Sequence, residues 1–385
     1  MKTKILLSVF LAFVFVFQTK AQWINKSFTF ESKVRQYRIY IPVIYSPANP
    51  ASLVIMLHGA GDNITTYSNI SGINLMADTA NFIVLFPQAL DDPFCSACWN
   101  SGAGIFGYYP NASINDVGFL NAMIDTTIAN YSINQSRMYI CGVSMGGFMT
   151  ERMACESNNR IAAFASVAGT IGQGFGICNP GRAIPIAHFH GTNDSIVGYY
   201  NNDYGINTDS LIKFWIANNQ CDTQAIFTNL PDVANDGYTI ENFVYKNGLQ
   251  NTEVELYKVN GANHVWLNLP QNDISYSIEI WKFFNKHKLQ TSIESFTTLT
   301  EQNILVYPNP SKDNVSIEFL SSVSQPQSFI FQTNIEICNI NGQIIENIQT
   351  TSIKTSINLN NLNCGIYIIK IITDKGVYTK KLVKQ

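Results

Sequence analysis

The sequence predicts an α/β domain with a doubly wound, mostly parallel sheet, followed by a small all-β sandwich. Between residues 23 and 288, short apolar runs alternate with longer amphipathic stretches, which is the strand–helix order of an α/β domain. A polar stretch rich in Ser and Thr follows, and beyond it short strands are separated by turn signals. We therefore expect an α/β domain at 23–288, a linker at 289–302 and a sandwich at 303–385.

The strands expected in the α/β domain are short runs, most of them almost continuously apolar, as strands buried on both faces of a parallel sheet are. They are SLVIMLHG (52–59), FIVLFPQ (82–88), RMYICGVS (137–144), IPIAHFHG (184–191) and TEVELYKV (252–259). The expected helices are DVGFLNAMIDTTIANY (116–131), GGFMTERMACESN (146–158), DSLIKFWIANN (209–219) and DISYSIEIWKFFNKHK (273–288). VRQYRIYIP (34–42) is expected to add an antiparallel strand at the start.

The sandwich is expected from short β-rich segments with turns between them. Asn341-Gly342 is a strong hairpin signal, and residues 374–376 form a second turn signal. The segments are ILVYPNP (304–310), NVSIEFL (314–320), FIFQTNIEICNINGQIIENIQ (329–349), TSINLNNLNCGIYIIKIIT (355–373) and GVYTKKLVKQ (376–385). No part of this region needs to be a helix.

The first 21 residues differ from the rest of the chain. Lys2 and Lys4 precede an apolar run, 5–17, that is too short to span a bilayer comfortably, and residues 19–21 offer the small side chains that a signal peptidase reads. We expect a secretory signal peptide at 1–21; the alternative is a membrane anchor. No later segment is long and apolar enough to span a membrane, so no membrane span is predicted.

The amino-acid composition indicates which kinds of partner and cofactor are not expected. The net charge is −3, 13% of residues are charged, and Lys and Arg form no run, so nucleic acid is excluded as an expected partner. Export permits disulfides among the eight cysteines. Cys95 and Cys98 form C-x-x-C, but no second C-x-x-C completes a zinc site, so one structural disulfide or two separate ones are preferred. No metal and no organic cofactor is expected.

The stretch GVSMG at 142–146 places Ser144 between an apolar strand and a helix. That context is what a nucleophile elbow requires: a tight strand-to-helix turn that holds the serine above the carboxyl ends of the strands. Gly142 and Gly146 remove side chains that would clash across the turn. A serine becomes a nucleophile only with a base, a group that orients the base, and donors for an oxyanion.

Chain order selects the partners of Ser144, because the order in this kind of fold is serine, acid, histidine. His264 follows an apolar strand, in a loop that can reach the serine, whereas His287 lies in a solvated basic helix end. Asp194 directly follows a buried-type strand, which brings it to the same edge of the sheet; the other acids between are expected to be caps and turn formers. The predicted triad is Ser144, Asp194 and His264.

The oxyanion needs two backbone N–H groups. The amide of Met145, the residue after the nucleophile, is the first expected donor. The second should come from the loop after the first central strand, LHGAGDN at 57–63, where Ala60 is preferred and Gly59 is the alternative. His58 either orders this loop or is a simple core residue.

Residues 23–288 resemble the secreted polyhydroxybutyrate depolymerase and feruloyl esterase group of α/β-hydrolases, in the neighbourhood of carbohydrate esterase family one. The motifs that carry the resemblance are, in order, VIMLHGAGDN, LFPQAL, CWN, NDVGFLNAMID, YICGVSMGGFM, CNPGRAIPIAHFHGTNDSIV and GANHVW. The resemblance implies an esterase with the triad above and supports Ala60 as an oxyanion donor. Members of the group usually have GGGH before the catalytic histidine, where this chain has GANH.

The last 80 or so residues resemble the type A sorting domain of the type IX secretion system. The motifs are VYPNPSKDNVSIEF, IEICNINGQII and LNCGIYIIKIITDKGVYTKKLVKQ. The resemblance implies that the secretion machinery is a partner. It also implies passage through the periplasm to the outside of the cell or to its surface. The alternative is an accessory sandwich such as a carbohydrate-binding module.

Aromatic residues near the predicted site suggest the substrate class. Trp99 and Tyr108 lie in a loop expected to overhang the serine, and Trp266 follows the predicted base. Aromatic faces stack on sugars, on a feruloyl ring or on a polyester chain, although aromatic residues also fill cores. We rank feruloyl or acetyl esters of plant polysaccharide first, polyester second and peptides third. A non-catalytic surface binding protein on a hydrolase fold is the alternative from another class.

The resemblance also makes a Cys178–Cys221 disulfide plausible. Cys178 precedes the strand that leads to Asp194, and Cys221 follows the next helix. A bridge between them would close a loop that includes the acid-bearing turn.

Overall fold

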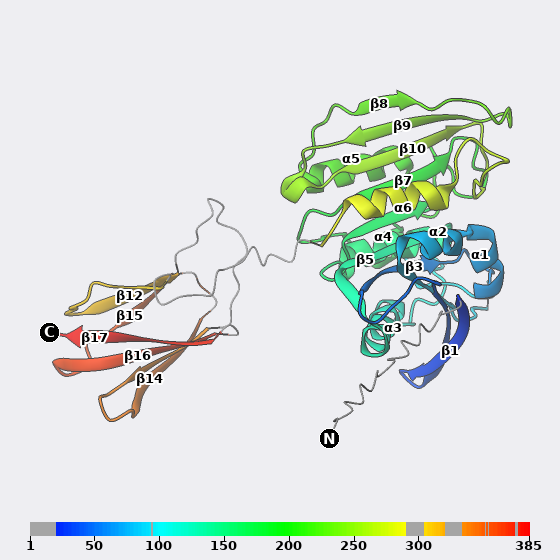
Figure 1. Cartoon of the computed structure of the whole chain (residues 1–385). Helices are drawn as coiled ribbons and strands as arrows, with labels where there is room; N and C mark the ends of the chain where they lie inside the picture. The colour runs from blue at the N-terminus through cyan, green and yellow to red at the C-terminus, as the bar shows by residue number, and fades with distance from the viewer. Residues whose placement is uncertain are drawn as a thin grey trace, which may run out of the picture. The chain divides into compact units, whose positions relative to one another are not determined.

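The computed structural model describes residues 21–93, 95–289, 304–319, 333–350, 352, 354–373 and 376–385. The chain divides into two compact units, Met1–Gln290 and Thr291–Gln385 (Figure 1). The predicted signal peptide, 1–21, lies outside the described residues except for Ala21. All of the predicted linker except Leu289 lies outside them as well.

The first unit is built on a ten-stranded sheet with the order β1-β2-β4-β3-β5-β6-β7-β10-β9-β8. The central strands from β4 to β10 pair in parallel, and the strands at both edges pair antiparallel. The strands are β1 (Gln22–Phe30), β2 (Lys33–Ile41), β3 (Ala51–Leu57), β4 (Phe82–Pro87), β5 (Ile133–Val143), β6 (Ala163–Val167), β7 (Ile186–Gly191), β8 (Ile226–Asn229), β9 (Thr239–Tyr245) and β10 (Val254–Asn260).

Helices cover both faces of this sheet (Figure 1). They are α1 (Ile64–Ser71), α2 (Ile73–Ala80), α3 (Asp116–Asn130), α4 (Met145–Glu156), α5 (Thr208–Asn219) and α6 (Tyr276–Lys286), with short 3-10 turns at η1 (Gln173–Phe175) and η2 (Leu249–Asn251). Side chains of α3, α4 and α5 pack in one apolar core, and side chains of α1, α2 and α6 pack in the other. The unit is therefore a three-layer, doubly wound α/β structure, as predicted.

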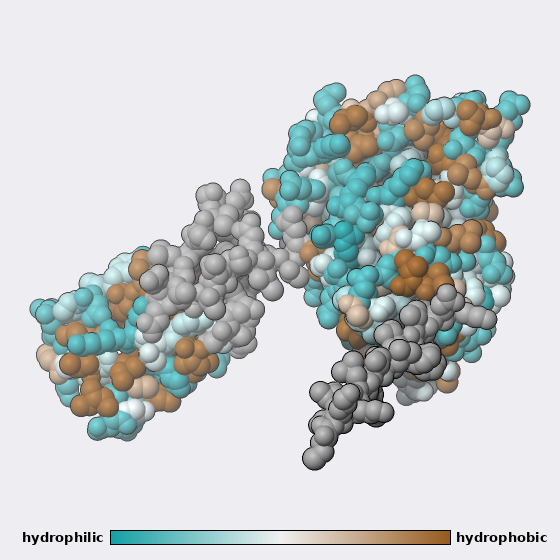
Figure 2. Space-filling model, viewed as in Figure 1, coloured by the Kyte–Doolittle hydropathy of each residue, from teal (hydrophilic) through white to brown (hydrophobic). Residues whose placement is uncertain are grey.

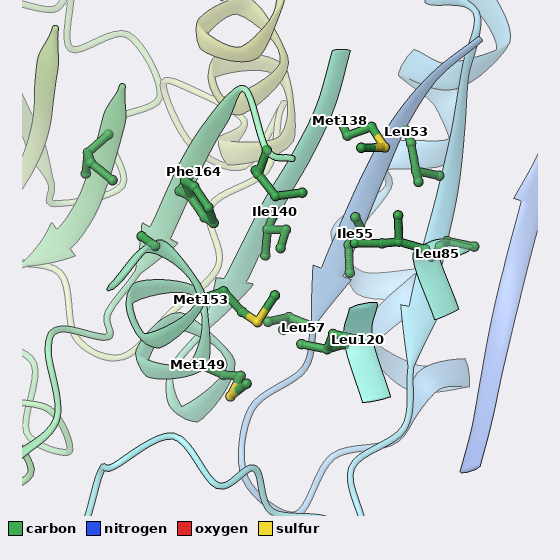
Figure 3. Packing of buried hydrophobic residues seen from close by; sticks show 14 of the residues in the cluster. Leu53, Ile55, Leu57, Leu85, Leu120, Met138, Ile140, Met149, Met153 and Phe164 are labelled. Carbon is green, nitrogen blue, oxygen red and sulfur yellow. The ribbon is translucent and has the colours of Figure 1, made fainter. Parts of the chain in front are cut away.

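Alternation along the strands explains why the central runs are apolar throughout. Leu53, Ile55 and Leu57 of β3 join the core under α3 and α4, where Met153 lies beside Leu57 (Figure 3). Val54, between them in sequence, joins the core of the opposite face. Successive side chains of a strand point to opposite faces, so a sheet covered on both sides requires apolar residues at every position.

Several elements of the first unit lie outside the predicted set. β6 is a five-residue strand, AFASV, whose small side chains give a weak strand signal. β1, β8 and β9 lie toward the sheet edges, where exposed polar residues interrupt the apolar pattern. Helices α1 and α2 are each eight residues long, which leaves little room for a periodic pattern.

The second unit packs two antiparallel sheets, as the sandwich prediction requires. One sheet has the order β11-β12-β15, and the other β14-β13-β16-β17. Its core holds apolar side chains from both sheets, among them Val315, Ile337 and Ile369. The strands are β11 (Ile304–Tyr307), β12 (Asn314–Phe319), β13 (Thr333–Cys338), β14 (Ile344–Thr350), β15 (Lys354–Asn358), β16 (Gly365–Thr373) and β17 (Gly376–Lys384).

The surfaces of both units mix hydrophilic and apolar residues on the face drawn in Figure 2. Within the described part of the chain, no helix is both long and apolar enough to cross a bilayer.

Candidate active site

The predicted site residues gather at one edge of the central sheet. Ser144 follows β5, Asp194 lies in the turn after β7, and His264 lies in the loop after β10. In the sheet, β5, β6, β7 and β10 are consecutive neighbours and run parallel. Since parallel strands present their carboxyl ends at the same edge, all three loops emerge there.

Ser144 occupies a tight turn between β5 and α4. Its φ of 55° and ψ of −124° are a conformation that residues with side chains rarely adopt. Its amide donates to the Val167 carbonyl at 2.8 Å, and its carbonyl accepts from the Phe148 amide at 3.0 Å. A Cβ at Gly142 would overlap the Gly146 carbonyl, so the glycines are needed for the close approach that the sequence predicted.

Asp194 and His264 form a short hydrogen bond. His264 Nδ1 lies 2.7 Å from Asp194 Oδ2, while Asp194 Oδ1 accepts the amides of Ile196 and Val197 at 2.9 and 2.8 Å. Burial alone would raise the pKa of Asp194, but hydrogen bonds from His190 and His264 outweigh it and hold the pKa well below its ordinary value. A carboxylate only accepts, so Nδ1 of His264 carries a proton and Nε2 is left as the basic nitrogen.

The histidine loop is fixed by Asn263, a residue whose role the sequence did not indicate. The Asn263 side-chain oxygen accepts from the Ser195 amide at 2.9 Å and from the Ser195 hydroxyl at 3.0 Å, so it joins this loop to the acid turn. It also accepts from the amide of His264 at 2.8 Å. Asn263 stands where the GGGH pattern has its third glycine. This departure is the feature of the sequence that could have identified the residue.

The loop after β3 lies against Ser144. A Cβ built on Gly59 would stand 3.3 Å from Cβ and 3.8 Å from Oγ of Ser144, so the Gly59 backbone approaches the serine closely and a side chain there would be crowded. His58 Nδ1 donates to the Gly59 carbonyl at 2.7 Å, and His58 Nε2 accepts the Ala89 amide at 3.1 Å. Burial lowers the pKa of His58, so the neutral ring orders this loop.

Trp99 requires a correction to its predicted role as a stacking platform. It has no exposed surface, and its indole nitrogen donates to the His58 carbonyl at 2.9 Å. Its backbone amide lies 3.3 Å from the sulfur of Met145. A buried indole offers no face to a ligand, so Trp99 braces the loop after β3 and the start of α4.

The other two predicted substrate contacts have different surroundings. Tyr108 is 36% exposed, and its hydroxyl donates to Asp92 at 2.5 Å. Trp266 is half-buried and packs edge-to-face on Tyr67 and Tyr276. Its indole nitrogen is buried and has no hydrogen-bond partner among the described residues.

The described residues form two disulfides, and one of them overturns a prediction. Cys95 and Cys98 are bridged to each other, as the C-x-x-C motif allowed. Cys178 pairs with Cys155 of α4, at a Cα–Cα distance of 5.0 Å, whereas Cys221 is a buried free thiol. The predicted Cys178–Cys221 bridge is therefore wrong, because the loop that holds Cys178 is tied to the nucleophile helix instead.

Two of the three side chains of the predicted triad are in direct contact. Asp194 and His264 are in contact, and Ser144 stands at the same sheet edge, but the described residues include no hydrogen bond between the Ser144 hydroxyl and His264. His287, the other histidine that follows the acid, was expected in a solvated helix end, but it is buried beside Glu253 at the end of α6. The described side chains include no cluster of His, Cys, Asp and Glu that could hold a metal ion.

Two family models match separate parts of the chain. Residues 35–180 match the family described as esterase PHB depolymerase, a range that includes the Ser144 turn and ends before Asp194 and His264. Residues 305–385 match the secretion system C-terminal sorting domain. The strand order and the tight turn at Ser144 agree with the predicted α/β-hydrolase fold. The match to the sorting domain confirms the predicted export to the outside of the cell or to its surface.

Curated relatives are similar to the α/β part of the chain. The bifunctional acetylxylan esterase/xylanase of Neocallimastix patriciarum is 28% identical over 54% of this chain and 27% of its own length. Poly(3-hydroxyalkanoate) depolymerase C of Paucimonas lemoignei is 28% identical over 57% of this chain and 55% of its own length. The probable feruloyl esterase C of Aspergillus niger is 27% identical over 50% of this chain and 64% of its own length. The chain therefore spans less than two thirds of each of these relatives.

Among solved structures, the acetyl xylan esterase from Aspergillus awamori is similar to 68% of this chain and to 99% of its own, with 15% identity and a TM-score of 0.47.

Proposed function

We propose that this chain is a secreted serine esterase that cleaves carboxylic esters through an acyl-enzyme, with Ser144 as nucleophile, His264 as base and Asp194 as the group that orients the base. The observation that carries the proposal is the 2.7 Å bond between His264 Nδ1 and Asp194 Oδ2 at the sheet edge where the strained Ser144 turn lies. The match of residues 35–180 to an esterase family supports the same activity.

The mechanism follows from the protonation of these groups. His264 Nε2 takes the proton of Ser144 as the hydroxyl oxygen attacks the ester carbonyl, and the buried carboxylate of Asp194 stabilises the imidazolium that forms. The same proton passes to the leaving alcohol when the ester C–O bond breaks. A water molecule then attacks the acyl-enzyme, with His264 again as base, and releases the acid and free Ser144.

The negative oxygen of the tetrahedral intermediate needs fixed donors. We assign the amide of Met145, the first residue of α4, and the amide of Ala60, with Gly59 as the alternative. The neutral His58 ring and the buried Trp99 hold the Ala60 loop in place, so the donors are ordered before substrate binds. Each such donor is worth roughly a hundredfold to a thousandfold in kcat.

Feruloyl or acetyl esters on plant polysaccharide are the substrates that we place first. Relatives whose names include acetylxylan esterase and feruloyl esterase support this ranking, and export fits it because polymers do not enter cells. Tyr108 and Trp266 remain the proposed substrate contacts. The second candidate is a polyester depolymerase, which the family description and the Paucimonas relative favour.

The type IX secretion machinery is the proposed partner of the C-terminal unit. The motifs of the type A domain and the match over 305–385 support this assignment. Protein recovered outside the cell should begin near Gln22 and end near Asn303, as N-terminal sequencing and intact mass would reveal. Recovery of protein that still ends at Gln385 would contradict removal of the unit.

One experiment tests the activity, and a second ranks the substrates. A fluorophosphonate should label wild-type protein at Ser144 and leave Ser144→Ala unlabelled, whereas a non-catalytic binding protein would not label at all. The mature enzyme should then be assayed on acetyl, feruloyl, hydroxybutyrate-oligomer and long-chain glyceride esters. A preference for hydroxybutyrate oligomers over every sugar ester would make the polyester reading the correct one.

A further inference from the structure

A continuous line of buried polar side chains connects helix α4 to the turn that carries Asp194. Ser166 Oγ on β6 lies 2.6 Å from Oε1 of Glu151 on α4 and 2.8 Å from Nδ1 of His188 on β7. His188 Nε2 lies 3.1 Å from Nδ1 of His190. All four side chains are at most 1% exposed, so their hydrogen bonds must be satisfied within the protein.

The far end of this line touches the catalytic acid. His190 Nε2 lies 2.7 Å from the Val197 carbonyl and 3.3 Å from Asp194 Oδ2. A carbonyl oxygen only accepts, so Nε2 of His190 must carry a proton. The Thr208 hydroxyl lies 2.9 Å from His190 Nδ1, the same nitrogen that faces Nε2 of His188.

With both imidazoles neutral, these contacts form an unbroken chain only when Glu151 is protonated. The Glu151 carboxyl then donates to Ser166, Ser166 donates to Nδ1 of His188, and Nε2 of His188 donates to Nδ1 of His190. Every link has one donor and one acceptor, and both imidazoles are neutral. The Trp215 indole nitrogen, 2.9 Å from Glu151 Oε2, donates in either state.

Loss of one proton to water breaks the chain at a defined place. The Ser166 hydroxyl turns to the Glu151 carboxylate, and the proton of His188 moves from Nε2 to Nδ1 so that it can donate to Ser166. Nε2 of His188 and Nδ1 of His190 then face each other as two lone pairs. Two acceptors repel, so the link between the imidazoles is lost, and Nδ1 of His190 keeps only the Thr208 hydroxyl as a donor. His190 is then less firmly held against Asp194.

We propose that Glu151, Ser166, His188 and His190 form a positioning relay for Asp194, and that protonation of Glu151 keeps the relay connected. The relay rests on the proposed esterase function, since it acts only through Asp194 and His264. With the relay connected, His190 holds one carboxylate oxygen of Asp194 in the orientation that His264 requires. With it broken, Asp194 orients His264 less well and acylation of Ser144 slows.

The electrostatic surroundings favour a protonated Glu151 and a neutral His188. Burial raises the pKa of Glu151 to about 7, against smaller opposing effects of the hydrogen bonds from Ser166 and Trp215. Burial, with a contribution from His190, holds the pKa of His188 well below its ordinary value. The titratable groups that face His190 are His188, Asp194 and the ring of Tyr199, at 5.5 Å. Glu151 forms no ion pair among the described residues.

The rate of fluorophosphonate labelling of Ser144, measured from pH 5.5 to 9, tests the relay. For wild type we expect a bell-shaped profile, which declines by about tenfold above neutral pH; a displacement of about 1 Å at a site can cost about a hundredfold. Glu151→Gln supplies a permanent N–H to Ser166, so its profile should rise to a plateau without the decline. Ser166→Ala disconnects the relay, so its plateau should match the wild-type rate at high pH.

The matched control is Glu156→Gln, on the same helix, where the carboxylate pairs with Arg152 near the surface. It should keep the bell-shaped wild-type profile. Thermal unfolding identifies any variant that does not fold. If Glu151→Gln does not fold, the pH profile of Ser166→Ala still tests the relay. An alkaline decline that persists in Glu151→Gln, or in Ser166→Ala, overturns the relay alone. Absence of labelling in wild type at every pH overturns the esterase and the relay with it.

Discussion

The side-chain oxygen of Asn263 accepts hydrogen bonds from both the amide and the hydroxyl of Ser195, at 2.9 and 3.0 Å. Ser195 follows the acid and Asn263 precedes the base. These two bonds therefore fix the distance between the loops that carry Asp194 and His264, in addition to the direct bond between those two side chains.

Asn263→Ala should therefore lower kcat by about tenfold to a hundredfold, because small misplacements of catalytic groups cost about this much. KM for an aryl acetate should change little, since the substitution removes no substrate contact. Asn260→Ala is the matched control, because the Asn260 side chain bonds to Thr239 and Glu241 of the neighbouring strand β9 and not to the acid turn. Equal kinetics for both variants would contradict a positioning role for Asn263.

The triad assignment predicts matched losses. Ser144→Ala should lower kcat by roughly a millionfold, as deletion of such a serine does elsewhere, and His264→Ala should fall within about tenfold of it because the two act as a unit. His287→Ala is the control, since His287 lies beside Glu253 at the end of α6. Near-normal turnover of His264→Ala on an aryl ester would exclude it as the base.

Trp99 should act through the oxyanion loop and not through substrate stacking. Trp99→Phe removes the indole donor to the His58 carbonyl and keeps an aromatic ring in the core. We expect kcat to fall by a similar factor for acetyl and feruloyl esters, with KM unchanged for both. Tyr108→Phe provides the comparison, because Tyr108 is partly exposed. A rise in KM confined to the feruloyl ester of Trp99→Phe would restore the stacking role.

The Cys155–Cys178 bridge should stabilise the folded chain. It closes a loop with a sequence separation of 23 residues. In the chain-entropy model a loop of this size contributes roughly 3 kcal/mol, before native strain is subtracted. Changing both cysteines to Ser should therefore lower the free energy of unfolding, measured in urea. Cys221→Ala, which breaks no disulfide, is the control. Peptide mapping without reduction should recover Cys155 linked to Cys178, and a peptide linking Cys178 to Cys221 would contradict the assignment.

Glu151 should also make stability depend on pH. Its pKa rises from an ordinary 4.5 to about 7 in the folded chain, so the folded state binds the proton more tightly. The stabilisation is fully present below pH 4.5 and is lost as the pH rises through about 7, a change of about 3 kcal/mol. Urea unfolding at pH 5.5 and 8.5 should show a smaller loss in Glu151→Gln than in wild type and Glu156→Gln. The same loss in all three proteins would mean that Glu151 is ionised at both values.

Local sequence was sufficient for much of this architecture. Continuous apolar runs predicted the buried central strands, because a sheet covered on both faces has no polar side. The glycines around Ser144 predicted the tight turn, because no side chain larger than a hydrogen atom fits at those positions. The edge strand β8, by contrast, has no buried residue, so no pattern distinguished it from a loop. Chain order, together with their positions directly after apolar strands, selected Asp194 and His264, and the structure brings them into contact.

Tertiary structure decided the features that depend on which elements become neighbours. Cys178 could be paired only once α4 was seen beside its loop, since sequence spacing does not report distance across a fold. Trp99 is an aromatic residue of the kind that contacts ligands, but in the packed structure its indole is directed toward His58. His188 and His190 share one face of β7 by simple alternation, which the sequence contains. Only the approach of α4 and β6 adds Glu151 and Ser166 to them, because hydrogen bonds between distant residues exist only after the layers have packed.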